Sequence, residues 1–134
     1  MQGVELSYQH RIRDFLLLNL GYTFLDARDV SEGRLNDELA YKPRHTFSAS
    51  ATAYSGPVTF NINCRYRSRI EEVFIYPGSE PDAAFIANAK LNLRIADHYS
   101  CYLAVDNIGN EQYEELERYR MPGRSYTAGA VVNF

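Results

Sequence analysis

The sequence lacks the features that mark several common classes of protein. No run within its 134 residues approaches the roughly 18 consecutive apolar residues of a membrane-spanning helix. The first residues do not combine a basic segment with an apolar one, so we expect any secretion signal to lie on sequence outside this chain. The formal charge of −3 disfavours a nucleic-acid surface.

Residues that could catalyse a reaction or bind a metal ion are not grouped along the chain. His10, His45 and His98 lie far apart, with no cysteine or carboxylate at the spacing of metal ligands. No Ser/His/Asp set, no paired acids of a defined cleft and no phosphate-binding loop is present. We therefore expect no catalytic residue, no metal site, no cofactor and no enzyme activity, and we expect His45 to begin a strand.

Alternation of apolar and polar residues is the dominant pattern that is present. Side chains of an extended chain point to its two faces in turn, so apolar residues at every second position predict a strand with one apolar face. The clearest case is 58–67, where Val58, Phe60, Ile62, Cys64 and Tyr66 share a face. The pattern occurs in seven segments: 4–12, 15–26, 45–54, 58–67, 85–95, 99–106 and 125–134.

The last of these segments keeps its alternation to the final residue. Its apolar face consists of Tyr126, Ala128, Ala130, Val132 and Phe134. A strand that continues to its last residue indicates a terminus held in a sheet. The chain also contains 11 Tyr and 7 Phe, and tyrosine suits positions that are apolar on one side and wet on the other, such as a membrane interface.

The connections between the segments are of two kinds. Three are short turns near 13–14, 55–57 and 97–98, and three are long polar loops at 27–44, 68–84 and 107–124. Successive connections of antiparallel neighbours lie at opposite ends of a sheet, so all the turns fall at one end and all the loops at the other. Transmembrane β-barrels sort their connections in this way. We predict an all-β chain of about seven antiparallel meander strands.

The second face of the predicted sheet carries charged and amide side chains. Arg65, Arg67, Lys90 and Arg94 cannot form a dry core, because unpaired buried charges cost several kcal/mol or more. This face is expected to meet a wet lumen or solvent. A soluble sheet with one solvated face gives the same alternation. The alternative is therefore a soluble β-barrel or sandwich that binds a small apolar ligand, as lipocalins do, with its apolar face inward.

Two further sets of residues carry specific expectations. Cys64 and Cys101 lie on predicted strands that a third strand separates, about 9.6 Å apart, whereas the Cα atoms of a disulfide lie within ~7 Å. We expect both to be small apolar side chains in the sheet. The candidates for a ligand-binding mouth are charged residues of the last loop, although such runs are more often simply solvated. They are Glu111, Glu114, Glu115, Arg118 and Arg120.

Ordered motifs in the second half of the chain resemble a known family. Residues 106–114 read Asp-Asn-Ile-Gly-Asn-Glu-Gln-Tyr-Glu, and residues 121–124 read Met-Pro-Gly-Arg before the last predicted strand. This order resembles the end of a TonB-dependent outer-membrane receptor, where an Asn-Leu-Phe-Asp-Lys-x-Tyr type segment and Pro-Gly-Arg precede a last strand ending in Phe. Residues 39–45, Leu-Ala-Tyr-Lys-Pro-Arg-His, are similar to the Pro-x-His segment that opens an earlier strand in the family. Ile108-Gly109 departs from the pattern, standing where the family prefers Leu-Phe.

The resemblance implies that the chain is part of a larger transmembrane barrel. Receptors of this family resemble 22-stranded barrels with a plugged lumen, and residues 1–134 would be the C-terminal segment, without the plug domain and the earlier strands. The implied function is that of barrel wall in the active transport of a ferric siderophore or a cobalamin-like chelate. TonB would supply energy through the plug, and lipid of a Gram-negative outer membrane would cover the apolar face.

Seven strands cannot close an antiparallel barrel, because pairing between neighbours needs an even number. The first and last strands would therefore present unpaired edges. We expect the isolated chain to associate with itself through these edges or through its apolar face, and we expect the segment 125–134 to be the place of attachment.

Overall fold

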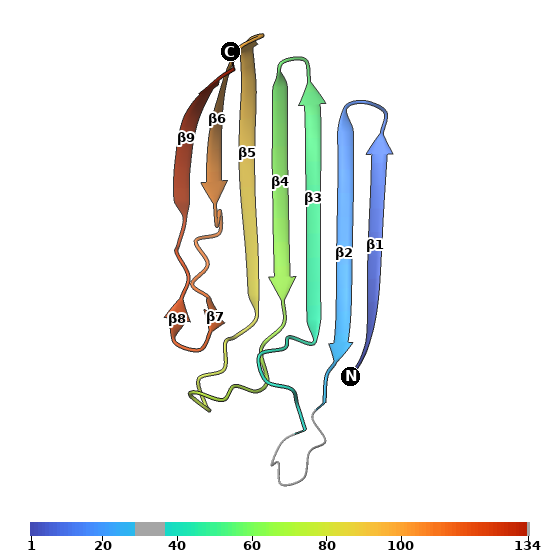
Figure 1. Cartoon of the computed structure of the whole chain (residues 1–134), viewed down its shortest axis with the longest axis vertical. Helices are drawn as coiled ribbons and strands as arrows, with labels where there is room; N and C mark the ends of the chain where they lie inside the picture. Colours follow the sequence, from blue (N-terminus) through green and yellow to red (C-terminus); the bar gives the residue numbers. More distant parts are fainter. Residues whose placement is uncertain (29–36, 134) are drawn as a thin grey trace.

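The computed structural model describes residues 1–28 and 37–133, which form a long sheet with a small hairpin beside it (Figure 1). The strands of the sheet are β1 (Gln2–Ile12), β2 (Leu16–Asp26), β3 (His45–Ser55), β4 (Val58–Arg67), β5 (Ala84–Ala96), β6 (Tyr99–Asp106) and β9 (Ser125–Val132). The hairpin consists of β7 (Glu114–Leu116) and β8 (Tyr119–Arg120). The described residues contain no helix long and apolar enough to cross a membrane.

The large sheet is a single antiparallel meander. Its order is β1-β2-β3-β4-β5-β6-β9, and each strand is antiparallel to its neighbours. This confirms the seven predicted strands and the prediction that His45 begins one of them. Phe134, the last residue of the predicted terminal strand, lies outside the described residues, as do residues 29–36 of the first loop.

The connections are sorted by length between the two ends of the sheet, as predicted. In Figure 1 the short turns β1–β2, β3–β4 and β5–β6 lie at the top with the C-terminus, whereas the long connections and the N-terminus lie at the bottom. Arg13 and Gly56 adopt positive φ angles of 49° and 54°, which the tight turns require. We call the two ends the turn end and the loop end.

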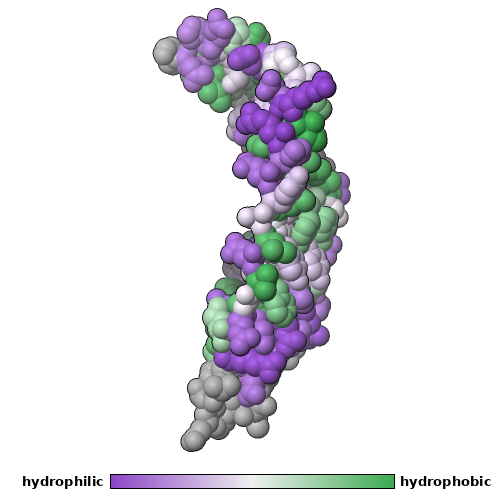
Figure 2. Space-filling view, turned by 90° about the vertical axis from the view of Figure 1, so that its right-hand side faces the viewer, coloured by the Kyte–Doolittle hydropathy of each residue, from purple (hydrophilic) through white to green (hydrophobic). Residues whose placement is uncertain are grey.

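One face of the sheet is apolar across all seven strands. Residues paired across neighbouring strands share a face, and near the loop end Tyr22, Phe47, Tyr66 and Phe85 form an aromatic row from β2 to β5. Leu103 on the same face is 60% exposed. In Figure 2, seen from the β1 side, hydrophobic residues follow the middle of the curved sheet and hydrophilic ones gather towards its ends.

This exposed face decides between the two interpretations of the alternation. A soluble barrel or sandwich requires an enclosed apolar interior, and the described residues form one open layer without such an interior. A transmembrane barrel instead turns an apolar band outward, with aromatic girdles at the membrane interfaces. The aromatic row matches a girdle on the loop side. The structure therefore favours the transmembrane interpretation.

The opposite, polar face is connected by hydrogen bonds between neighbouring strands. Asn88 Nδ2 donates to Asn63 Oδ1 at 3.0 Å between β5 and β4, and Asn61 Nδ2 donates to Thr52 Oγ1 at 2.8 Å between β4 and β3. Amides that bond each other in this way satisfy their polar groups while leaving the face wettable. This accounts for the asparagines at alternate positions of β4 and β5.

Cys64 and Cys101 are free and lie on β4 and β6. Cys64 is paired in register with Ala87, and Cys101 with Leu93, so β5 separates them. This confirms the predicted arrangement.

The best-buried apolar side chains lie in the loops and at the loop end of β5. They are Ala27, Ala40, Ile70, Val73, Ala84 and Ile86. Val73 is only 1% exposed although it lies in a connection between strands. The long loop predicted at 107–124 contains the β7–β8 hairpin, which the sequence analysis did not predict. The small packed core of the chain is thus formed at the loop end.

Candidate functional site

Three connections meet at the loop end and form the candidate site. Segments 37–44 and 68–83 are joined by the backbone, since Tyr41 N donates to Glu72 O at 2.9 Å and Pro43 forms a bridge with Ile70. The third connection, 107–124, carries the β7–β8 hairpin. We call the described parts of these connections the loop cluster.

Asn107 and Asn110 fix the base of the third connection. Asn107 is buried, accepts from Glu111 N at Oδ1 (2.9 Å), and donates from Nδ2 to Glu111 O (2.9 Å) and Pro122 O (3.2 Å). Asn110 Oδ1 accepts from Arg124 N at 2.9 Å. A Cβ on Gly123 would lie 2.7 Å from that same Oδ1, so glycine is required for this approach. The Asp-Asn-Ile-Gly-Asn and Pro-Gly-Arg motifs therefore close one loop from both of its ends.

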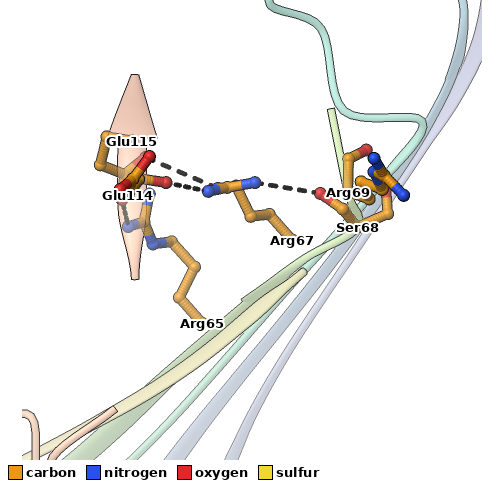
Figure 3. A network of polar contacts seen from close by, with 6 residues as sticks. All are labelled: Arg65, Arg67, Ser68, Arg69, Glu114 and Glu115. Carbon is orange, nitrogen blue, oxygen red and sulfur yellow. Dashed lines mark hydrogen bonds and ion pairs between the residues drawn. The ribbon is translucent and has the colours of Figure 1, made fainter. Parts of the chain in front are cut away.

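Two arginines of β4 hold the hairpin over the polar face (Figure 3). Arg65 forms an ion pair with Glu115 Oε1, and Arg67 donates to the backbone oxygen of Glu114. Arg67 Nε also lies 3.8 Å from Glu115 Oε2. Arg65 is half exposed, whereas the Arg67 side chain is only 6% exposed, so the second guanidinium has left water almost completely.

The turn of the hairpin is attached to both other connections by Glu117. Its Oε1 accepts from Tyr41 Oη at 2.7 Å and from Ile75 N at 3.2 Å, and Tyr41 Oη accepts from Phe74 N at 3.1 Å. Burial raises the pKa of Glu117, but the hydrogen bonds from Tyr41 and the backbone amides outweigh it and leave that pKa below its ordinary value. We call this group of contacts the Glu117 clasp.

The five residues predicted for a ligand mouth do not share one surface. Glu114 and Glu115 lie on β7, Arg120 lies on β8, and Arg118 lies in the turn with its guanidinium carbon 4.2 Å from the centre of the Tyr76 ring. Glu114, Arg118 and Arg120 line one open cavity, whereas Glu115 faces Arg65. Glu111 lies nearer the base of the loop, where its backbone bonds to Asn107.

In the described part of the chain, three of the larger open cavities lie at or near the hairpin. The first, of about 350 Å³, lies between residues 79–83 and residues 112–120. The second, of about 440 Å³, is bordered by Asn63, Arg65 and Asn88 of the polar face and by residues of the connection 107–124. The third, of about 300 Å³, is mostly apolar and is lined by Tyr41, Ile75, Tyr76, Leu116, Glu117 and Tyr119. The hairpin is thus accessible from several sides.

Glu80 borders the first cavity and is held by other groups of the loop cluster. Glu80 accepts from Gly78 N at 2.7 Å and lies 3.5 Å from Arg69 Nη2, and the Gly78 amide is the main cause of its lowered pKa. In the described part of the chain, no group of three or more His, Cys, Asp or Glu residues is placed to hold a metal ion.

Sequence reasoning missed Tyr41, Glu117 and the two arginines of β4 as parts of this site. Arg65 and Arg67 were recognised only as members of the polar face, although two arginines of one face at the end of a strand were an available signal. Nothing in the sequence distinguishes Glu117 from the other acids of its run, because its role depends on a tyrosine 76 residues away.

The sheet is antiparallel, with one apolar face and one hydrogen-bonded polar face, and its long loops gather at one end. These features define the wall of an outer-membrane β-barrel. Residues 1–108 match the family described as TonB dependent receptor-like, beta-barrel. The chain belongs to the TonB-dependent receptor family. Barrels of this family are proteins of the Gram-negative outer membrane, and the family consists of transport receptors.

Solved structures support the same fold. The chain is similar to the ferric-catecholate import receptor Fiu of Escherichia coli K12, with a TM-score of 0.80 and 21% identity over 98% of this chain and 20% of that one. It is similar to the siderophore receptor PiuA of Acinetobacter baumannii, with a TM-score of 0.79 and 16% identity over 96% and 21% of the two chains.

A third similar structure is the ferripyoverdine receptor of Pseudomonas aeruginosa, with a TM-score of 0.80 and 16% identity over 98% of this chain and 19% of that one. The chain thus spans about a fifth of the length of these receptors. A search of curated protein sequences gave no match.

Proposed function

We propose that this chain is the C-terminal wall segment of an outer-membrane receptor that imports a ferric siderophore or a cobalamin-like chelate with energy from TonB. Its seven strands would belong to a 22-stranded barrel whose plug domain and earlier strands lie on further sequence. The family match over residues 1–108, on a sheet with one apolar and one polar face, carries this proposal. A ferric siderophore is the first candidate, because the similar structures are named as siderophore receptors.

The two faces and the loop cluster receive distinct roles under this proposal. The apolar face contacts outer-membrane lipid, and the polar face lines the lumen. The loop cluster lies at the extracellular mouth, since transmembrane barrels place their long loops outside the cell. Glu114, Arg118 and Arg120 border the cavity of about 350 Å³ there and are the residues proposed to meet the chelate.

Uptake measurements test the proposal directly. The gene that contains this chain is deleted from its bacterium, and uptake of radiolabelled iron is measured with a panel of ferric siderophores, beside uptake of labelled cobalamin. We expect the deletion to abolish uptake of one chelate class, the intact gene to restore it, and loss of TonB to give the same defect. Unchanged uptake of every chelate would contradict the proposal, as would a reading frame that ends with these 134 residues and has no upstream strands.

A further inference from the structure

Arg67 has an unusual set of partners for a buried guanidinium. Its residue is 5% exposed, and its Nη1 and Nη2 donate to the backbone oxygens of Ser68 and Glu114. Among the described residues its Nε has no hydrogen-bond partner although it is buried, and Glu115 Oε2 lies 3.8 Å away. Buried polar groups normally have a partner, so this nitrogen is a donor aimed at a position that Glu115 fills incompletely.

One carboxylate is shared between two guanidinium groups at this place. Glu115 pairs with Arg65 through Oε1 and faces Arg67 through Oε2. Two positive charges therefore meet one negative charge, and the group of three carries a net positive charge. Arginine forms its strongest hydrogen bonds with oxyanions that it binds through two parallel N–H groups, and Arg67 has no such pairing with Glu115.

Arg65 is also within reach of the lumen, and Arg67 lies two residues further along the same face of β4. Arg65 borders the cavity of about 440 Å³ between the polar face and the connection 107–124, together with Asn63 and Asn88. Asn63 and Asn88 are joined to each other by a hydrogen bond and form a polar floor. An anionic group that enters along the polar face would meet Arg65 first and Arg67 behind it.

We propose that Arg65 and Arg67 form an oxyanion-binding site in which Glu115 stands in for a carboxylate or phosphate group of the incoming ligand. An oxyanion that binds Arg65 and the unpaired Nε of Arg67 displaces the Glu115 side chain and loosens β7, which the contact of Arg67 with the Glu114 backbone still ties to the end of β4. The exchange couples binding at the lumen wall to movement of the hairpin, because the ligand binds only the loosened arrangement. The Glu117 clasp does not involve Arg65 or Arg67 and keeps the turn of the hairpin attached. The inference rests on the proposed function only for the identity of the ligand.

The test follows the hairpin and the anion separately from transport. The full-length protein that contains this chain is prepared in outer-membrane vesicles with Cys64 and Cys101 replaced by serine. A spin label is attached at Leu116→Cys on β7, where the native side chain is 53% exposed. Label mobility is measured during titration with inorganic phosphate and, separately, with citrate, at constant ionic strength set with chloride.

We expect phosphate or citrate to raise label mobility saturably and chloride to have no effect. Glu115→Gln should raise label mobility without any anion, although the contact of Arg67 with the Glu114 backbone remains. It should bind the anion about tenfold more tightly, because the internal competitor has lost its charge. Glu111→Gln removes the same charge from the same loop away from the arginines and should behave like the parent. Arg65→Gln should abolish the response, and heat-modifiable migration in gels checks that each variant is folded.

Equal label mobility and equal anion affinity in Glu115→Gln and Glu111→Gln would overturn the inference. A mobile hairpin in Glu115→Gln with no gain in anion affinity would also overturn it, because Glu115 would then be an attachment point only. Neither readout needs TonB or a transported chelate. A receptor that responds to phosphate but imports nothing would therefore contradict the proposed function alone, and one that imports a chelate without this response would contradict the inference alone.

Discussion

Glu117 illustrates how a single side chain joins connections that are distant in sequence. Its carboxylate accepts from Tyr41 and from the amide of Ile75, so segments 37–44 and 68–83 are both attached to the turn of the hairpin. A charged acceptor forms stronger hydrogen bonds than a neutral one. The charge of Glu117 therefore strengthens the attachment of the hairpin turn to the other two connections, whereas its shape alone would also be provided by glutamine.

We expect Glu117→Gln to loosen the loop cluster without affecting the sheet. The neutral amide accepts more weakly, so amide hydrogen exchange at 74–76 should become several-fold faster, while exchange within β4 and β5 stays unchanged. Tyr41→Phe should have a similar local effect because it removes the donor to the same carboxylate. Glu111→Gln serves as control, and equal exchange in Glu117→Gln and this control would show that the clasp does not stabilise the loops.

The clasp should also respond to acid. The pKa of Glu117 in the folded chain lies below its ordinary value of 4.5, so its contribution to stability is fully present above pH 4.5 and is lost as the pH falls through the folded pKa. The protection factors at 74–76, which are exchange rates corrected for the intrinsic effect of pH, should therefore fall on acidification below pH 4.5 and stay level above it. Glu80 has a lowered pKa as well. The part of the acid response that is due to Glu117 is the difference between the parent protein and Glu117→Gln. Equal responses in these two proteins would contradict the role assigned to Glu117.

At the scale of elements, β9 depends on a close contact with β6. Gly129 is paired with Tyr102, and a Cβ on the glycine would lie 2.5 Å from the Tyr102 ring. The Tyr102 ring covers the space that a side chain at Gly129 would occupy. Lys90, on the neighbouring strand β5, has its Nζ 4.4 Å from the centre of that ring. An aromatic residue that covers a glycine in this way fixes the register of an otherwise weak strand.

We expect Gly129→Val to displace the Tyr102 ring and to lower the free energy of unfolding by about 1 kcal/mol, the size of a lost cross-strand pair and cation–π contact. The measurement is urea unfolding of the full-length protein in lipid vesicles. Thr127→Val, on the same face of β9, replaces a hydroxyl with a methyl group away from the ring and should have a smaller effect. A Gly129→Val variant as stable as Thr127→Val would contradict this account.

The strands of the large sheet could be predicted from sequence, whereas the hairpin could not. Each large strand alternates over enough residues to show a period of two, and the fourth does so without a break. β7 and β8 have three and two residues, too few for any period. Their turn contains Arg118 at a φ of 61° in place of glycine or asparagine, so the usual turn signal is missing.

The candidate site was predictable only in part, for a related reason. The charged run in loop 107–124 located the right connection, but the partner of Glu115 is Arg65, 50 residues away. Such pairings depend on how loops fold back over a sheet, and one-dimensional spacing contains no information about that. The sequence analysis placed Arg65 and Arg67 on the polar face but did not predict that the loop would fold over it.

At the scale of the whole molecule, the apolar face determines where the chain can be stable. A charged side chain on the lipid face of a barrel costs about 2–4 kcal/mol near the middle of the membrane, whereas the lumen tolerates charge. Ile62 lies in the middle of the apolar face, paired with Ala51 and Ala89. Thr59 is on the same strand and the opposite face.

We expect Ile62→Arg to reduce the free energy of unfolding in lipid vesicles by about 2–4 kcal/mol and Thr59→Arg to change it by less than half as much. Folding is measured by heat-modifiable migration and by urea titration of the full-length protein. A larger cost for Thr59→Arg than for Ile62→Arg would mean that the polar face meets lipid, and the assignment of the two faces would be wrong.

The edges of the sheet give the last prediction, for the chain of 134 residues produced alone. β1 and β9 each have a neighbour on one side only, so the backbone donors and acceptors of their outer sides can pair with a second copy. We expect sedimentation in detergent to show oligomers.

Ser7→Lys with Thr127→Lys places charge on both edge strands and should shift the chain towards monomer, since edge lysines oppose strand addition. Thr23→Lys with Thr59→Lys, on the interior strands β2 and β4, adds the same two charges and should leave the oligomers unchanged. If the unaltered chain sediments as a monomer, the edges do not drive association. If the interior pair of lysines dissociates the oligomers equally well, association depends on net charge and not on strand pairing.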